Sequence, residues 1–215
     1  MVPMSSTDNN VTAQTPTLEQ QGQLLGIAVT AIRHGLLYQT PLTVALDHYR
    51  DDDLLLQQRA TFVTLKINHE LRGCIGTLTA HQPLIQDVAR NAYQAAFRDP
   101  RFDPLQQQEL EQLHVSISIL SPPEPVTIKS EQDLISQLRP GQDGLIIKDG
   151  LHHATFLPSV WEQLPRPIEF LQHLKHKAGL AVEYWSDTLQ VERYTSFEFG
   201  TDVAVCLSEL ASKSL

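Results

Sequence analysis

Apolar residues recur at helical intervals in two segments of the first half of the chain. Thr17 and Gln20 have the spacing of a capping box, and the apolar positions after them predict a helix that ends near Gly35. Pro83 is suited to the first turn of a second helix. The residues predicted to form the buried stripe of this second helix are Leu84, Val88, Ala89, Ala92 and Ala96.

Alternation of apolar and polar residues predicts three strands in the same half. Residues 61–67 (TFVTLKI) alternate, a turn follows, and residues 71–78 return as the second strand of a hairpin. Residues 113–120 (LHVSISIL) alternate most regularly, and the prolines of SPPEP end that strand because proline cannot continue a ladder of hydrogen bonds.

Short elements of both kinds follow in the second half. Asp149 and Gly150 are typical of a hairpin turn, and Gly179 ends a helix that has Lys175 and Lys177 in its last turn. The predicted elements are a helix at 131–138, strands at 145–148 and 151–156, helical segments at 158–164 and 168–178, and a final strand at 189–199. Hairpins mixed with helices, without regular βαβ alternation, predict an α+β fold with mainly antiparallel sheet and flanking helices.

Composition and charge limit the environment and the partners. The chain has 215 residues, a formal charge of −9 and a pI near 5.4, which argues against nucleic acid or anionic lipid as a partner. Residues 1–16 are polar and are predicted to be a disordered tail, followed by one domain at 17–200 and a small, polar tail at 201–215. The N-terminus has no signal-peptide pattern and no segment suits a bilayer, so we expect a cytoplasmic protein with no membrane partner.

The two cysteines, Cys74 and Cys206, are expected to be reduced, because the chain shows no secretory signal. Neither has a second cysteine at zinc-ligand spacing. The adjacent His152 and His153 would point to opposite faces of a strand, and phosphate-binding glycine motifs are absent. We therefore predict no metal site and no cofactor.

The segment HELRGCIGTL (69–78) is the most unusual part of the sequence. On a strand, Arg72 and Cys74 would project from one face, where the guanidinium would favour the thiolate. Gly73 and Gly76 remove side chains beside the sulfur, which leaves room for a substrate or for a neighbouring backbone. The alternative is a structural strand that holds a small buried cysteine. A nucleophilic cysteine needs a base, and the candidates are His69, His81 and His114.

A second unusual cluster is FRDPRFDPL (97–105), in which charges of both signs alternate between prolines. One interpretation is a loop held by its own ion pairs, with Phe102 anchored in the core. The other is an anion- or carboxylate-binding site that includes Asp99 and Arg101, in which Arg101 grips the ligand bidentately.

Six segments in fixed order resemble one known family. They are LRGCIGTL, DPRFDPL, SISILSPPEPV, GQDGLII, ATFLPSVWEQL and FLQHLKHKAGL. Together they resemble the AMMECR-type domain, called protein A of the AmmeMemoRadiSam system, over about residues 18–200. The resemblance implies two unequal lobes, with the RGCIG segment facing a cleft between them. It also implies a pathway shared with a Memo-like protein and a radical SAM enzyme, whose genes often accompany the family. No catalytic activity is settled for the family.

Two functions follow as hypotheses. The first is a binding or adaptor component that acts with a Memo-like protein and a radical SAM enzyme through a cleft lined by LRGCIG. The second is an enzyme acting on a small anionic substrate, with Cys74 as nucleophile or substrate-contacting thiol and Arg72 and Arg101 as electrostatic clamps. In both, the binding residues are predicted to be Arg72, Gly73, Gly76, Asp99 and Arg101.

Overall fold

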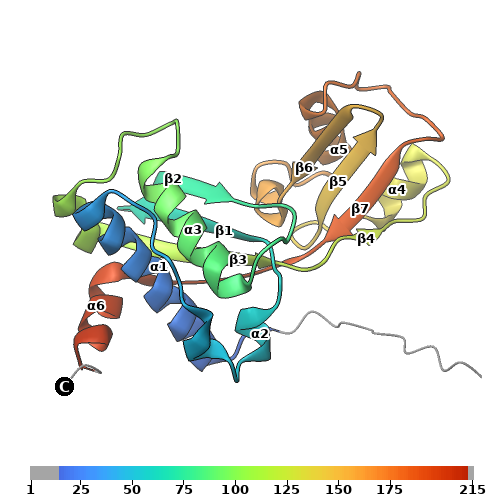
Figure 1. Ribbon diagram of the computed structural model, residues 1–215. Coiled ribbons are helices and arrows are strands. Elements are labelled where there is room, and N and C mark those ends of the chain that lie inside the picture. The colour runs from blue at the N-terminus through green and yellow to red at the C-terminus, as the bar shows by residue number, and fades with distance from the viewer. Residues whose placement is uncertain (1–14, 213–215) are drawn as a thin grey trace, which may run out of the picture.

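The chain folds around two antiparallel sheets, which lie at opposite ends of the molecule in Figure 1. This computed structural model describes residues 15–212. The strand orders are β2-β1-β3-β8 and β4-β7-β5-β6, and the named strands pair in antiparallel fashion. The prediction of an α+β fold with antiparallel sheet and flanking helices is confirmed. The predicted disordered tail at 1–16 lies, up to residue 14, outside the described residues.

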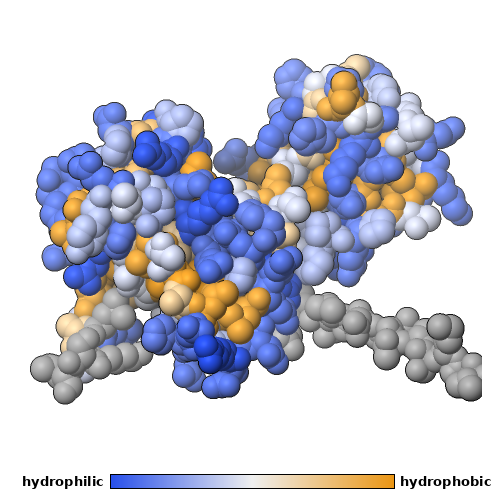
Figure 2. Space-filling view, viewed as in Figure 1, coloured by the Kyte–Doolittle hydropathy of each residue, from blue (hydrophilic) through white to orange (hydrophobic). Residues whose placement is uncertain are grey.

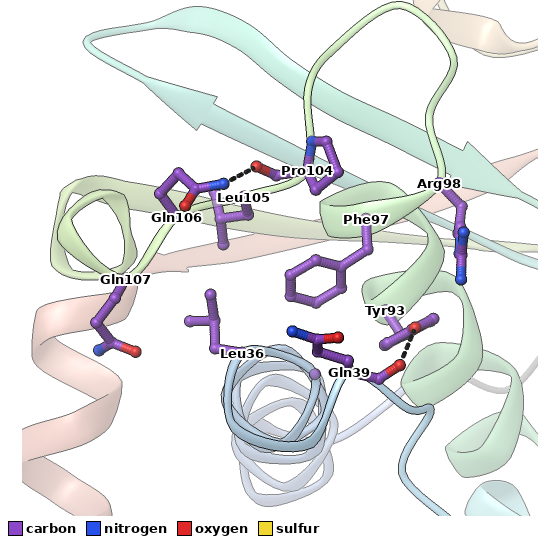
Figure 3. Close-up of a pocket in the computed structure, with 10 residues that line it drawn as sticks. Leu36, Gln39, Tyr93, Phe97, Arg98, Pro104, Leu105, Gln106 and Gln107 are labelled. Atoms are coloured by element: carbon purple, nitrogen blue, oxygen red, sulfur yellow. Dashed lines mark hydrogen bonds between the residues drawn. The ribbon is translucent and has the colours of Figure 1, made fainter.

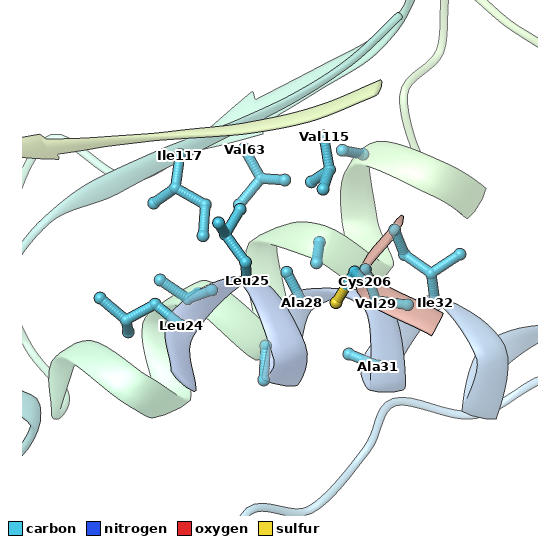
Figure 4. Packing of buried hydrophobic residues seen from close by; sticks show 14 of the residues in the cluster. Leu24, Leu25, Ala28, Val29, Ala31, Ile32, Val63, Val115, Ile117 and Cys206 are labelled. Carbon is cyan, nitrogen blue, oxygen red and sulfur yellow. The ribbon is translucent and has the colours of Figure 1, made fainter. Parts of the chain in front are cut away.

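The first sheet packs one face against three helices. Figure 4 shows Val63, Val115 and Ile117 pointing from this sheet towards Ala28 and its neighbours on α1. These side chains and that of Leu65 are buried in one core cluster. The strands are β1 (Thr61–Ile67), β2 (Glu70–Gly76), β3 (Leu113–Leu120) and β8 (Ser196–Asp202). The helices are α1 (Leu18–Tyr38), α3 (Leu84–Phe97) and α6 (Val203–Ser212). Shorter helical segments are η1 (Leu46–Tyr49), α2 (Asp53–Leu56) and η2 (Gln107–Gln112).

Helix α1 begins as predicted but ends later. Thr17 and Gln20 form the capping box. Gly35 does not end the helix, because Gln39 takes the left-handed conformation (φ 58°) and donates its N–H to the Gly35 carbonyl. Glycine is required at 35 for packing instead, since a Cβ there would lie 2.3 Å from the Phe97 ring.

The second sheet has its own apolar core. Leu145, Ile147 and Val191 pack with helical residues, including Trp161 and Phe170, whose rings stack 3.8 Å apart. The strands are β4 (Glu124–Pro125), β5 (Gly144–Asp149), β6 (His152–Phe156) and β7 (Gln190–Tyr194). The helical elements are α4 (Glu131–Gln137), η3 (Pro158–Glu162) and α5 (Pro167–Lys177).

The predicted final strand at 189–199 is wrong as a single element. It is two strands, β7 and β8, which belong to different sheets and are separated by Thr195. Ser121 and Thr195 hydrogen-bond to each other at this crossing. Alternation continues on both sides of Thr195, so the sequence pattern does not reveal the change of sheet.

The predicted C-terminal tail at 201–215 also needs correction. Strand β8 continues to Asp202, and α6 follows it. Val203 and Cys206, which lie at helical spacing, are both buried in the core of the first sheet. Figure 4 shows Cys206 beside α1. Within residues 15–212, none of the helices has the length and apolar character needed to span a bilayer.

Candidate functional site

The LRGCIG segment forms most of β2, which is one of the two edge strands of the first sheet. At Cys74 the outward backbone groups of this edge are bound by side chains from the loop after α3. The Cys74 N–H donates to Asp99 Oδ2 at 2.9 Å, and Arg101 Nη2 donates to the Cys74 carbonyl at 3.2 Å. The loop therefore occupies the place of a neighbouring strand and closes this part of the edge.

Asp99 is the centre of this arrangement. It is 3% exposed, and it accepts hydrogen bonds from the backbone and side chain of Arg101 as well as from Cys74. These bonds, those of the Arg101 side chain above all, hold the pKa of the Asp99 carboxyl well below its usual range. The predicted ion pair within the loop is confirmed, and both charges are used to hold β2.

Stability should depend on pH through Asp99. The pKa of the Asp99 carboxyl is lower in the folded protein than in the unfolded chain, where it is about 3.9. Its contribution to the free energy of unfolding is therefore fully present above about pH 3.9, and it is lost as the pH falls from there towards the folded pKa. Asp99→Asn is expected to lower the free energy of unfolding by about 1–3 kcal/mol at pH 7. Urea titrations should show this difference shrinking at pH 3. A difference that is equal at both pH values would contradict the assignment.

Arg72 lies at a β-bulge, since β1 and β2 shift register there. That Arg72 and Cys74 project from one face stays a prediction. The Arg72 guanidinium forms two hydrogen bonds with Glu109, at 2.7 and 3.1 Å, and these lower the pKa of Glu109. Phe102 is not in the core, contrary to the interpretation of it as a core anchor. The guanidinium carbons of Arg72 and Arg101 lie 6.0 and 5.5 Å from the centre of the Phe102 ring. Both arginines are thus held by groups of this chain.

Cys74 lies on the face of the sheet opposite the helices, which we call the open face. Thr64, its cross-strand neighbour, donates its hydroxyl to the sulfur at 3.3 Å. Thr64 is also paired with Ser116, and Ser116 with Gly200, so the four residues form one row across the strands. The open face comprises Phe62, Thr64, Lys66, Cys74, Gly76, His114, Ser116, Ser118, Glu198, Gly200 and Asp202.

Two of the three candidate bases, His114 and His81, bind other groups. His114 Nδ1 lies 2.8 Å from Asp202, and His81 contacts the Thr79 carbonyl and Arg90. His69 sits in the hairpin turn at φ 67°. No histidine within residues 15–212 forms a hydrogen bond with the Cys74 sulfur. Nucleophilic catalysis by Cys74 stays a prediction.

The glycines of the motif serve close packing. A Cβ at Gly73 would lie 2.1 Å from the Ala95 carbonyl oxygen on α3, and one at Gly76 would lie 2.3 Å from the Phe62 ring. The space beside Cys74 that the sequence left open to a substrate or to a backbone is thus filled at these two positions by the protein itself.

Two hollows can be compared with this site. One, of about 480 Å³, lies between α1, α3 and residues 104–107, and Figure 3 shows Phe97 pointing into it beside Leu36 and Leu105. Another, of about 570 Å³, lies between residues 78–80 and the second sheet. Cys74 lines neither of them. The predicted two lobes and cleft stay predictions.

Comparison with known proteins identifies the family. The model of the AMMECR1 family matches residues 25–199, most of the described chain. The chain belongs to the AMMECR1 family.

AMMECR1-family relatives agree with this assignment. A protein of Methanothermobacter thermautotrophicus is 37% identical over 156 residues, which cover 70% of this chain and 79% of the relative. Protein MK0488 of Methanopyrus kandleri is 32% identical over 177 residues, covering 79% and 82%. The crystal structure of the uncharacterized protein PH0010 from Pyrococcus horikoshii superposes with a TM-score of 0.73 at 30% identity, covering 83% of this chain and 90% of that one. The fold is therefore that of the AMMECR1 family.

The residues that support the AMMECR1 motif are scattered in the sequence. Glu109 and Thr64 are not indicated by any sequence pattern, although both contact the motif. Arg72 and Glu109 are 37 positions apart, and no local spacing connects them. Within the part of the chain that the structure describes, no three His, Cys, Asp or Glu side chains lie close enough to hold a metal ion.

Proposed function

We propose that this AMMECR1-family protein is a cytoplasmic binding component that acts with a Memo-like protein and a radical SAM enzyme. In this proposal, the LRGCIG segment lines a cleft in which partner or ligand is bound. The two partner classes come from the family that the sequence motifs resemble. The binding role is supported by the geometry around β2.

The observation that carries the proposal is how firmly the segment is held. Asp99 and Arg101 bind both backbone groups of Cys74, Thr64 binds its sulfur, and Glu109 holds Arg72. Cys74 itself remains partly exposed. A surface that is already ordered loses little conformational entropy on binding, and this suits a recognition surface.

The charge pattern of the open face supports recognition of a partner. Lys66, His114 and Asp202 lie side by side in one cross-strand row, and all three are exposed. Exposed charges in a fixed arrangement contribute mainly to specificity and to the rate of association.

Reversing one of these charges tests the proposal. The protein should co-purify with a Memo-like protein or a radical SAM enzyme of the same organism at micromolar concentration. Lys66→Glu should weaken this association about ten-fold or more, because it reverses a charge in the row. Arg33→Glu is the matched control, because Arg33 is an exposed residue of α1, and α1 does not belong to the open face. Loss of binding in both variants, or no affinity for either partner class, would contradict the proposal.

Catalysis by Cys74 on a small anionic substrate is the alternative. It is supported by the partial exposure of the thiol and by the nearness of Arg101 to Cys74. Cys74→Ala separates the two functions, because a binding surface should keep most of its affinity for partners while thiol chemistry would be lost completely.

A further inference from the structure

The hollow of about 570 Å³ lies between the loop after β2 and the second sheet. One part of the lining is Leu78, Thr79 and Ala80, which are separated from the LRGCIG segment by Thr77 alone, and another is β5 and β6 of the second sheet. Pro123 adds to the lining from the connection after β3. The volume falls within the range of small-molecule sites, which is about 300–1,000 Å³.

A packed apolar cluster adjoins this hollow. Phe62 of the first sheet and Ile146 of the second pack against one cluster that contains the buried Tyr194. Ile146 also lines the hollow, together with Thr155, whose hydroxyl lies 2.9 Å from the Tyr194 hydroxyl. Figure 2 shows apolar surface near the region where the two groups of elements meet. One side of the hollow is therefore formed by tightly packed groups.

Cationic groups gather on the wall formed by the second sheet. Lys177 donates to the Thr155 carbonyl at 3.0 Å, and its ammonium nitrogen lies 5.2 Å from the centre of the Phe156 ring. Lys177 forms no ion pair with any of residues 15–212, so its charge and its remaining donors are available. Lys148 is paired with Glu192 at 2.7 Å, and His153 lies opposite Lys148 in the register of β5 and β6.

This concentration of lysine is unusual for the chain. The net charge is −9, and the whole sequence contains only six lysines, of which two line this one hollow. Glu192 offsets the charge of Lys148, which leaves Lys177 as the cation that faces the hollow without a carboxylate partner among the described residues. Leu78, Ala80 and Pro123 also line the hollow, and they suit an apolar group.

We propose that this hollow binds a small organic anion, with its anionic group near Lys177 and its apolar body against Leu78 and Ile146. A lysine ammonium acts as a point charge that accepts a carboxylate or a phosphate, and the apolar wall requires a hydrophobic body. The inference deepens the proposed function by naming the class of ligand that binds beside the LRGCIG segment. It rests on the proposed function, which states that this region of the protein binds a ligand or partner.

A matched pair of probes tests the ligand class. 3-Phenylpropanoate and the neutral 3-phenylpropanamide have the same apolar body and differ in charge, and both are titrated up to about 10 mM while backbone amide NMR shifts are followed. We expect the carboxylate to bind at least about five-fold more tightly, with the largest shifts at Leu78, Ile146 and Thr155. Inorganic phosphate alone should bind more weakly than the carboxylate, because it has no apolar body.

Variants then test the residues. Lys177→Met keeps the apolar stem over Phe156 and should weaken 3-phenylpropanoate about five-fold or more, and Lys177→Gln should do the same. Lys129→Met, at an exposed lysine outside the hollow, should bind as the wild type does. Any of four results would overturn the inference. They are equal affinity for 3-phenylpropanoate and 3-phenylpropanamide, unchanged affinity in both Lys177 variants, NMR shift changes at residues outside the hollow, and no binding at about 10 mM.

Failure of this inference is distinguishable from failure of the proposed function. Lys66 does not line the hollow, so Lys66→Glu should leave the probe titration unchanged even where it removes partner binding. A different combination would overturn the small-anion inference: the wild type binds neither probe, and Lys177→Met loses binding to the partner protein. In that case a group of the partner protein, and not a small anion, would occupy the hollow.

Discussion

Asp87→Ala is expected to lower the free energy of unfolding by about 3–5 kcal/mol, the largest effect of any single change considered for this protein. Asp87 is fully buried on α3. Its carboxylate accepts the backbone N–H and hydroxyl of Thr61, the hydroxyl of Thr77 and the side-chain amides of Gln82 and Asn91. Alanine would leave these donors buried without an acceptor, and it would detach the start of β1 from the helix.

Urea unfolding at pH 7 measures this change. Asp187→Ala is the matched control, because Asp187 is exposed, and its effect should stay within about 0.5 kcal/mol. Asp87→Asn should fall between wild type and Asp87→Ala, since an amide keeps one acceptor oxygen. A loss below about 1 kcal/mol in Asp87→Ala would show that the network is dispensable.

Gly73→Ala should destabilise the fold by about 3 kcal/mol, although it adds one methyl group. The new Cβ would lie 2.1 Å from the backbone oxygen of Ala95, and a backbone atom inside a helix cannot move aside as the end of a side chain can. Strand β2 would have to withdraw from α3. The hydrogen bond between Cys74 and Asp99 would be disturbed as well, because the loop after α3 supplies Asp99.

Gly22→Ala is the matched control for Gly73→Ala. Gly22 lies in α1, and no atom of a neighbouring element lies within 4 Å of the place that an added methyl group would take. Alanine there should therefore stabilise the protein by about 0.5–1 kcal/mol through its higher helix propensity. Thermal or urea unfolding of the two variants should give changes of opposite sign. Equal stability of Gly73→Ala and wild type would mean that β2 does not approach α3 as described.

Elements with a regular pattern and clear end signals can be predicted from the sequence. Strand β3 has the predicted bounds, 113–120, because its alternation is regular and the prolines after it stop the ladder. Strands β7 and β8 are not separated by the pattern, because alternation shows that a segment is extended and does not show which sheet it joins. Helix α6 escapes prediction because its sequence is rich in small residues, and its burial depends on contact with α1.

The sequence predicts which residues belong to the candidate site, but it does not predict what each of them contacts. One of the two interpretations of residues 97–105 is a loop held by its own ion pairs, and Asp99 and Arg101 do form such a pair. That this pair binds the backbone of Cys74 depends on β2 being an edge strand, and strand order is a property of the whole sheet. In the same way, the bulge at Arg72 and its pairing with Glu109 arise from contacts between distant segments.

Protection of Cys74 by a bound partner tests the central claim, that the LRGCIG segment is part of a binding surface. The wild-type protein is treated with iodoacetamide alone and in complex with a Memo-like protein or a radical SAM enzyme, and each cysteine is followed by peptide mass spectrometry. Cys206 is an internal control, because it is only 5% exposed and should react slowly in both states. We predict that the complex slows alkylation of the partly exposed Cys74 about ten-fold or more. An unchanged rate at Cys74 in an established complex would contradict the account.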